Sequence, residues 1–85
     1  MDISRAEQRI LHLLAQGGRI ETERGETRKI EHVTCISREG WRAPGLDLFL
    51  FRKLKRRRAI ASKRGQPYRI TRRGLELVRS ELNNR

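Results

Sequence analysis

The sequence predicts a single α+β domain over residues 1–85, in the order helix, hairpin, helix, hairpin, helix. Apolar residues recur with helical spacing in three separate segments. Two extended segments lie between them, and a glycine-containing turn interrupts each one. A chain of 85 residues has room for one small hydrophobic core and no second domain.

The first helix is expected over residues 5–16. Ser4 and Glu7 have the spacing of a capping box, in which each side chain satisfies a free backbone N–H group at the start of the helix. The apolar face follows the spacing i, i+4, i+7, i+8 and consists of Ala6, Ile10, Leu13 and Leu14. Gly17 and Gly18 supply the left-handed backbone at which helices commonly end.

Two extended segments on either side of residues 24–27 predict the first hairpin. The second segment carries β-branched residues, which favour strands: Ile30, Val33, Thr34 and Ile36. Their alternation is imperfect, so the inward-facing side is left open. Residues 37–46 indicate a loop, with a short helical turn as the alternative. With such a turn, residues 47–57 would be the second helix of a helix-turn-helix motif.

A second helix follows Asp47, whose carboxylate is placed to cap it. One side of this helix is apolar and is expected to face the core: Leu50, Phe51 and Leu54, with Leu48 at its margin. The far side is basic: Arg52, Lys53 and Arg56. The second helix is therefore expected to pack on the core and to present cations to solvent.

The second hairpin is predicted around Lys63–Gln66, a basic tip that contains glycine. Pro67 fits the start or the edge of a strand because it lacks a backbone donor. Thr71 is then expected to cap the last helix, whose apolar residues recur at i, i+3, i+7: Leu75, Val78 and Leu82. A basic hairpin followed by Tyr-x-Ile-Thr-x-x-Gly at the start of a helix is typical of a winged helix, so we expect a winged-helix-like domain with this hairpin as the wing.

Positive charge is concentrated in the C-terminal half of the chain, whose net charge is +11 overall. Residues 1–45 hold eight Lys or Arg and seven Asp or Glu, a net of +1, whereas residues 46–85 hold thirteen and three, a net of +10. Such segregation favours a polyanionic partner, with nucleic acid before an acidic protein or an anionic membrane. The alternative is a solvated surface that confers only solubility. The expected phosphate-contacting residues are Arg52, Lys53, Arg56, Arg57, Lys63, Arg64, Arg72 and Arg73.

Two aromatic residues are candidates for contact with a partner. Phe49 falls among the basic residues of the second helix, where it could stack on a base, wedge between base steps or fill a pocket in a protein. The alternative, which we favour, is that the helix packs on the first hairpin and buries Phe49. Trp41 lies in a loop and is expected to cover the core, with partner binding as the alternative.

No set of residues indicates catalysis, a metal site or a cofactor. Ser/His/Asp and Cys/His arrangements are missing, and Gly17-Gly18 ends a helix where a nucleotide-binding loop would open one. The single cysteine, Cys35, allows no intrachain disulfide, fits a reducing compartment and is expected to be a small buried residue. The missing catalytic sets predict a non-enzymatic protein without a small-molecule substrate. Because no apolar run resembles a signal peptide or a membrane span, we expect the protein in the cytoplasm.

Four segments also carry a family resemblance: ISRAEQRILHLLAQGGRI, SREG, FRKLKRRRAIASKRGQPYRI and GLELVRSELNNR. Over nearly the whole chain they resemble the YjhX-type family of small bacterial toxins. The resemblance implies the toxin of a toxin–antitoxin pair, inhibition of DNA topoisomerase I, and a cognate antitoxin as partner. It brings no contact residues with it.

Two functions of different classes remain open at this point. The first is the inhibitory toxin, whose basic surface binds the topoisomerase, its DNA, or both. The second is a winged-helix transcriptional regulator, in which the second helix enters a major groove and the wing contacts the DNA backbone. An RNA-associated or ribosome-associated module is a third reading.

Overall fold

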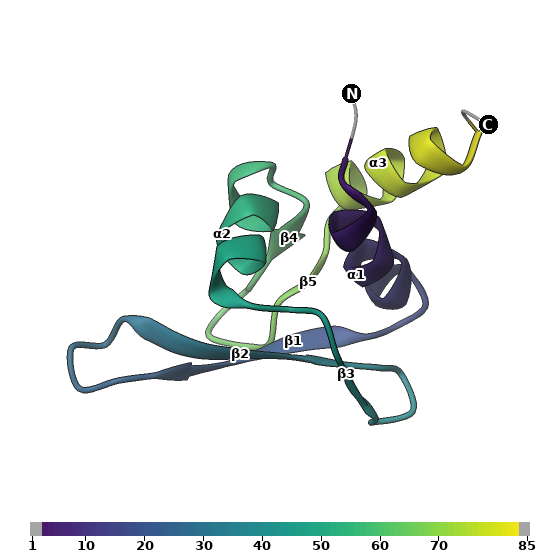
Figure 1. Cartoon of the computed structure of the whole chain (residues 1–85). Coiled ribbons are helices and arrows are strands. Elements are labelled where there is room, and N and C mark those ends of the chain that lie inside the picture. The colour runs from purple at the N-terminus through teal and green to yellow at the C-terminus, as the bar shows by residue number, and fades with distance from the viewer. Residues whose placement is uncertain (1–2, 84–85) are drawn as a thin grey trace.

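The computed structural model describes residues 3–83 and the side chains of residues 3–80. Over this range, three helices and two antiparallel sheets form an α+β fold in the predicted order (Figure 1). The elements are α1 Arg5–Ala15, β1 Arg19–Arg24, β2 Ile30–Ile36, β3 Arg42–Ala43, α2 Leu48–Arg56, β4 Ile60–Ala61, β5 Arg69–Ile70 and α3 Arg72–Asn83.

Helix α1 begins and ends as its sequence predicts. Glu7 N–H donates to Ser4 Oγ at 3.1 Å, and Ser4 N–H donates to Glu7 Oε1 at 2.9 Å, which completes the capping box. At the other end Gly17 has a left-handed backbone with φ of 108°. The N–H groups of Gly17 and Gly18 bond back to the last turn, to the carbonyls of Leu14 and Leu13.

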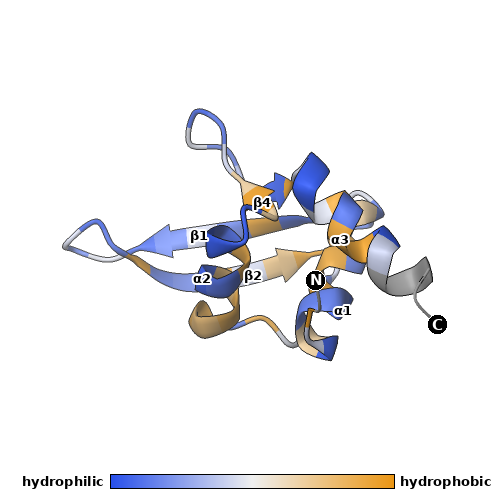
Figure 2. Cartoon of the chain, turned by 90° about the horizontal axis from the view of Figure 1, so that it is seen from above, coloured by the Kyte–Doolittle hydropathy of each residue, from blue (hydrophilic) through white to orange (hydrophobic). Residues whose placement is uncertain are grey.

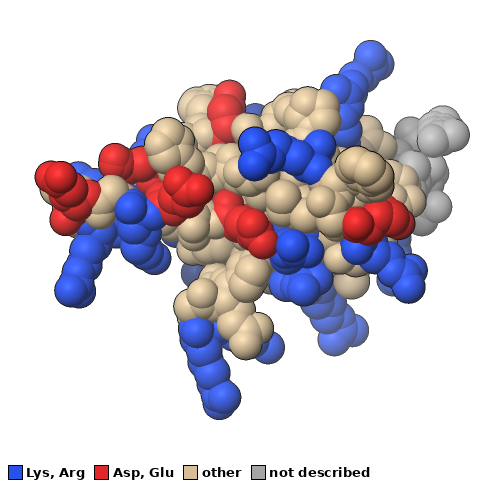
Figure 3. Space-filling model, turned by 90° about the horizontal axis from the view of Figure 1, so that it is seen from below, with Lys and Arg blue, Asp and Glu red and all other residues tan. Residues whose placement is uncertain are grey.

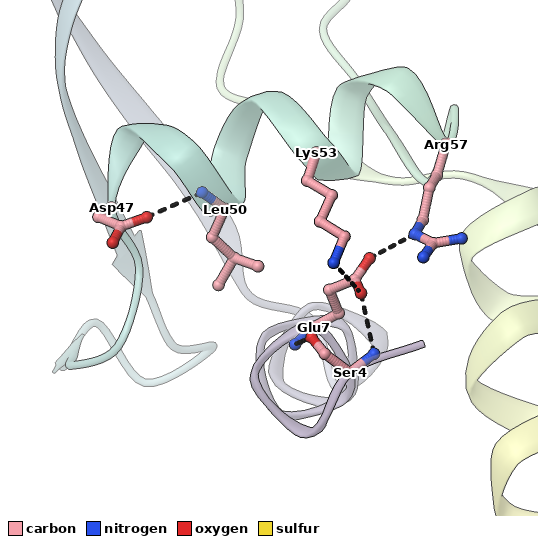
Figure 4. Close-up of polar contacts among 6 residues, drawn as sticks. All are labelled: Ser4, Glu7, Asp47, Leu50, Lys53 and Arg57. Atoms are coloured by element: carbon pink, nitrogen blue, oxygen red, sulfur yellow. Dashed lines mark hydrogen bonds and ion pairs between the residues drawn. The ribbon is translucent and has the colours of Figure 1, made fainter. Parts of the chain in front are cut away.

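The buried face of α1 is rotated from the predicted one. It consists of Glu7, Ile10, Leu11 and Leu14, whereas Ala6 is exposed and Leu13 is only half-buried. The carboxylate of Glu7 therefore occupies a position in the core. A pattern of apolar residues cannot predict this position, because glutamate is charged. The cause lies in α2, whose cations approach α1 on this side (Figure 4).

The first hairpin is long, and the helices lie on one side of the sheet to which it belongs (Figure 1). This sheet has the order β1-β2-β3, and a bulge at Glu23/Arg24 shifts the β1–β2 register near the tip. The helical turn considered for residues 37–46 is wrong: a tight turn, closed by Gly40 N–H to the Ser37 carbonyl at 2.9 Å, leads into the short strand β3.

The second sheet pairs β4 with β5 and continues toward β1. Ile20 and Tyr68 exchange two backbone hydrogen bonds of 2.9 Å, so the second hairpin lies against the start of the first. The tip is closed by Gln66 N–H to the Lys63 carbonyl at 3.0 Å. Thr71 caps α3 as predicted, because its Oγ1 accepts from Gly74 N–H at 3.1 Å.

The core lies between the helices and the inner face of the first sheet. Leu50, Phe51 and Leu54 of α2 are buried as predicted, and the Phe51 ring meets Tyr68 edge-on at 4.9 Å. From α3 the core takes Leu77 and Val78, so the predicted repeat through Leu75 is offset; Leu82 lies outside the described side chains. Figure 2 shows apolar residues where helices and strands meet, and hydrophilic residues at both hairpin tips. Among the described helices, none has the length and apolar character to cross a membrane.

Candidate nucleic-acid interface

The outer side of α2 carries an aromatic residue followed by two arginines. Asp47 Oδ1 accepts from Leu50 N–H at 2.8 Å and sets the start of the helix. Burial of the apolar stripe then fixes its rotation and turns Phe49, Arg52 and Arg56 outward. The favoured expectation that Phe49 is buried is wrong, since 70% of the residue is exposed. The core is already filled by its neighbours Leu50 and Phe51, so Phe49 stays on the basic side.

Lys53 and Arg57 lie differently from the other predicted cations, because both reach back to Glu7 (Figure 4). Lys53 Nζ is 3.3 Å from Glu7 Oε1, and Arg57 Nε donates to Glu7 Oε2 at 2.5 Å. The Lys53 and Arg57 side chains keep 34% and 23% of their area exposed, while Glu7 is fully buried. The prediction that Lys53 points to solvent is therefore wrong. Its ammonium group pairs with the buried carboxylate of Glu7, as the Arg57 guanidinium group does.

The electrostatics of this cluster favour an ionised Glu7. Burial by itself raises the pKa of the carboxyl, but hydrogen bonds from the Ser4 backbone, Arg57, the Ser4 hydroxyl and Lys53 together outweigh it. The pKa of Glu7 is consequently held below its ordinary value.

Hydrogen bonds join the end of α2, the second hairpin and the start of α3. Thr71 Oγ1 donates to the Arg58 carbonyl at 2.6 Å, and Thr71 N–H donates to the Ala59 carbonyl at 2.9 Å. Lys55 Nζ lies 5.6 Å and 5.7 Å from the ring centres of Phe51 and Tyr68, within range of cation–π attraction. These contacts place Arg58, directly after α2, beside the start of α3.

A groove of about 450 Å³ runs along the second hairpin to the start of α3. Its walls combine cations with small apolar groups, and it is lined by Ala61, Lys63, Gln66, Pro67, Arg69, Ile70, Thr71 and Arg72. Arg69 also donates to the carbonyls of Gly17 and Gly18, at 3.3 and 3.4 Å. No carboxylate lines this groove among the described residues, so its potential is positive.

The predicted cations thus separate into two groups. Three have a carboxylate partner: Lys53 and Arg57 with Glu7, and Arg73 with Glu76 at 3.8 Å. Five are exposed and form no ion pair with any acid in the described part of the chain: Arg52, Arg56, Lys63, Arg64 and Arg72. Within residues 46–80, four further cations are exposed that were not among the predicted contacts: Lys55, Arg58, Arg69 and Arg79. Contact of any of them with phosphate stays a prediction.

The opposite face of the molecule is different in character. Figure 3 views it from below, where acidic and basic side chains are interspersed. On β1, Glu21 and Arg19 pair at 3.0 Å and Glu23 is exposed, whereas Glu31 of β2 lines a groove with Leu48 and Arg52 of α2. This mixed-charge surface reflects the sequence of the first hairpin, in which acidic and basic residues alternate closely.

Trp41 lies away from α2, in the turn that joins β2 to β3. The backbone N–H of Trp41 donates to Ser37 Oγ at 3.1 Å, and 74% of the residue is exposed. The expectation that Trp41 covers the core is therefore wrong, because the turn over residues 38–41 is exposed throughout. Trp41 remains a candidate contact separate from the α2 face.

Cys35 behaves as a small core residue. It is fully buried on β2, and burial raises the pKa of its thiol. The described residues contain no group of three or more His, Cys, Asp or Glu that could hold a metal ion.

Comparison with known proteins gives one consistent result. The whole chain, residues 1–85, matches the family model of YjhX toxins, described as "Putative toxin of bacterial toxin-antitoxin pair". UPF0386 proteins from Rhizobium johnstonii and Agrobacterium fabrum are 72% and 73% identical over 85 residues, covering all of both chains. A UPF0386 protein from Hyphomonas neptunium is 73% identical over 84 residues, 99% of each chain. No solved structure matches significantly.

Proposed function

Since the chain belongs to the YjhX family of bacterial toxin–antitoxin toxins, we propose that it is such a toxin and inhibits DNA topoisomerase I through its basic surface. It acts in the cytoplasm by binding, without catalysis, and its cognate antitoxin binds it in turn. The observation that carries this proposal is the group of five exposed cations on α2, the β4–β5 tip and the start of α3 that have no ion pair with any described acid.

Physical chemistry favours DNA as the polyanion. Unpaired like charges repel one another and destabilise a small domain, and a phosphate backbone relieves that repulsion. If each of the five cations engages one phosphate, log affinity falls with log salt concentration at a slope of about −4.5. A complex held mainly by apolar contacts would show a much weaker dependence on salt.

The fold supplies a way for these cations to meet DNA. In the proposed winged-helix-like arrangement, α2 faces the duplex with Phe49, Arg52 and Arg56, while the β4–β5 hairpin is the wing and contacts the backbone. Phe49 then packs against DNA or against the enzyme that holds it. Occupying DNA in this way competes with the topoisomerase for its substrate.

The test is relaxation of supercoiled DNA by purified topoisomerase I with increasing amounts of the protein. We expect the wild type to inhibit relaxation. An Arg52→Ala/Arg56→Ala variant, which leaves the apolar stripe of α2 intact, is expected to lose this inhibition. The matched control is Arg5→Ala/Arg9→Ala, because these arginines are also exposed and four residues apart on a helix, α1. The control loses the same charge and is expected to inhibit like the wild type.

Two results would count against the proposal. If topoisomerase I relaxes DNA at an unchanged rate in the presence of saturating protein, the protein does not inhibit this enzyme. Equal loss of inhibition in both double variants would mean that net charge acts without a defined surface.

The second candidate is a transcriptional regulator, favoured by the exposed row of Phe49, Arg52 and Arg56 on a helix that could enter a major groove. This function predicts a footprint at one DNA site in the presence of excess competitor DNA. A footprint without inhibition of relaxation would favour the regulator.

A further inference from the structure

Three residues other than glycine have a left-handed backbone within residues 3–83, and all three are arginines. They are Arg28, Arg58 and Arg64, with φ of 65°, 59° and 54°. In this conformation the Cβ atom is crowded by the backbone, so glycine is preferred, and asparagine and aspartate are tolerated better than other residues. A long charged side chain at such a position calls for a reason outside local stability.

Arg58 occupies a helix-ending position at which the same chain elsewhere uses glycine. After α2, Arg58 N–H bonds to the Lys55 carbonyl at 2.9 Å and Ala59 N–H bonds to the Leu54 carbonyl at 3.0 Å. After α1, Gly17 stands at the matching position, with the equivalent pair of bonds to the last turn. Both helices thus end in a Schellman motif. The first has the favoured glycine at the left-handed position, whereas the second has Arg58 there.

Arg64 repeats the pattern at the tip of the β4–β5 hairpin. The turn Lys63–Gln66 is closed by a 3.0 Å backbone bond, and its central residues Arg64 and Gly65 have φ of 54° and 74°. Two left-handed central residues define a type I′ turn, for which Asn-Gly is the preferred pair. Here arginine stands where asparagine is favoured.

The surroundings of Arg58 and Arg64 point to an anionic ligand. Both side chains are exposed, and neither forms an ion pair or side-chain hydrogen bond with another described residue. The Thr71 hydroxyl bonds to the Arg58 carbonyl, which fixes this arginine beside Arg72 and Arg73 at the start of α3. Two hydrogen-bonded turns therefore carry exposed arginine side chains in the cationic half of the chain.

Arg28 provides an internal comparison because it has the same backbone strain in another electrostatic setting. It lies at the tip of the first hairpin, beside a groove whose charged lining combines Glu26 and Glu31 with Lys29 and with Arg52 of α2. Its carbonyl accepts from Arg24 at 2.6 Å, and the tip belongs to the mixed-charge half of the chain.

We infer that Arg58 and Arg64 contact the phosphate backbone of duplex DNA, and that the chain keeps them in left-handed turns at the expense of its stability. The inference rests on the proposed DNA-binding surface; it adds Arg58 to that surface and gives Arg64, already part of it, a defined role. The planar guanidinium group can bond two phosphate oxygens at once. A turn that already fixes the backbone reduces the freedom lost when that contact forms.

The experiment replaces each arginine with the residue that its turn prefers. Arg58→Gly and Arg64→Asn are expected to raise the Tm by about 4 °C each, because they relieve backbone strain. In the same proteins the affinity for a 20-base-pair duplex is expected to fall about ten-fold, and the salt slope to become shallower by about one per residue. Arg28→Gly, the matched control, is expected to raise the Tm similarly while its DNA affinity stays within two-fold. Arg58→Lys and Arg64→Lys keep the charge and are expected to retain most of the affinity.

Several outcomes overturn the inference. The inference fails if the Arg58→Gly/Arg64→Asn double variant binds DNA with the affinity and salt slope of the wild type, whatever its Tm. It also fails if this variant binds DNA normally but no longer inhibits relaxation, because the two arginines would then contact the enzyme. A Tm that falls in these variants overturns the claim about stability.

Failure of this inference is distinguishable from failure of the proposed function. If the Arg52→Ala/Arg56→Ala variant loses DNA binding while the double turn variant keeps it, the proposed surface stands and only this assignment fails. If the wild type binds DNA through Arg58 and Arg64 but leaves topoisomerase I active, the assignment stands and the proposed function fails.

Discussion

Replacing Glu7 with glutamine tests whether a buried carboxylate holds α2 in place. The glutamine amide keeps an oxygen that can accept from Ser4 N–H, so the capping box survives. The negative charge that pairs with Lys53 and Arg57 is lost. The variant therefore separates the charge interaction between α1 and α2 from the local start of α1.

The magnitude follows from the burial of the three groups. Leaving a fully buried charge without its partner costs about 3–5 kcal/mol. Here the two cations keep 34% and 23% of their side chains exposed, so water relieves part of this cost. We expect Glu7→Gln to lower the free energy of unfolding by about 2 kcal/mol. For a domain of this size that corresponds to a Tm lower by about 8–16 °C.

The assay is urea denaturation followed by circular dichroism, with Glu21→Gln as the control. Glu21 also pairs with an arginine, Arg19 at 3.0 Å, but the Glu21 side chain is 50% exposed whereas Glu7 is fully buried. The control is expected to change the free energy of unfolding by less than about 0.5 kcal/mol. If Glu7→Gln proves as mild as the control, the reasoning about the buried cluster is refuted.

The pH dependence of stability gives an independent check on the same cluster. The pKa of Glu7 in the folded protein is lowered, so the unfolded chain takes up a proton on this residue at a higher pH than the folded one. Its stabilising contribution is therefore complete above the ordinary pKa of glutamate and is lost as pH falls through the lowered pKa. Unfolding measured across this acidic range should show a smaller loss of stability in Glu7→Gln than in the wild type; equal losses would contradict the assignment.

Three further predictions concern single residues. Gly74→Ala is expected to lower the free energy of unfolding by about 2 kcal/mol, because an added Cβ would lie 2.4 Å from the Ala59 carbonyl oxygen; unchanged urea denaturation would argue against this close approach. Phe49→Ala should change stability by less than about 0.5 kcal/mol, since the side chain is exposed, yet weaken inhibition of relaxation; a large loss of stability would mean that Phe49 packs in the core. Cys35 should react with a thiol reagent at pH 8 far more slowly in the folded than in the unfolded protein, because it is buried and its pKa is raised; comparable rates would contradict its burial.

Local chemistry accounts for what could be predicted about the fold. The capping box of α1, the Asp47 cap of α2 and the Thr71 cap of α3 each join groups three residues apart, so residue type and spacing suffice to find them. The apolar stripe of α2 is similarly short-range, and its three buried residues were assigned correctly. The concentration of positive charge in the C-terminal half is likewise a property of the chain alone.

The tertiary structure decided how the charges are used. Glu7 and Arg57 are fifty residues apart in the chain, and no local pattern indicates that they meet. The contacts with Glu7 turn Lys53 and Arg57, two predicted surface cations, inward. Phe49 stays on the outer side of α2. The left-handed backbone at Arg58 and Arg64 was also beyond prediction, because arginine is a poor residue for that conformation. Sequence alone therefore determined the three helices, the two hairpins and the sign of the charge, since these depend on near neighbours, but not the short strand β3. The set of cations left for a partner depends on contacts between distant segments, which only the folded chain brings together.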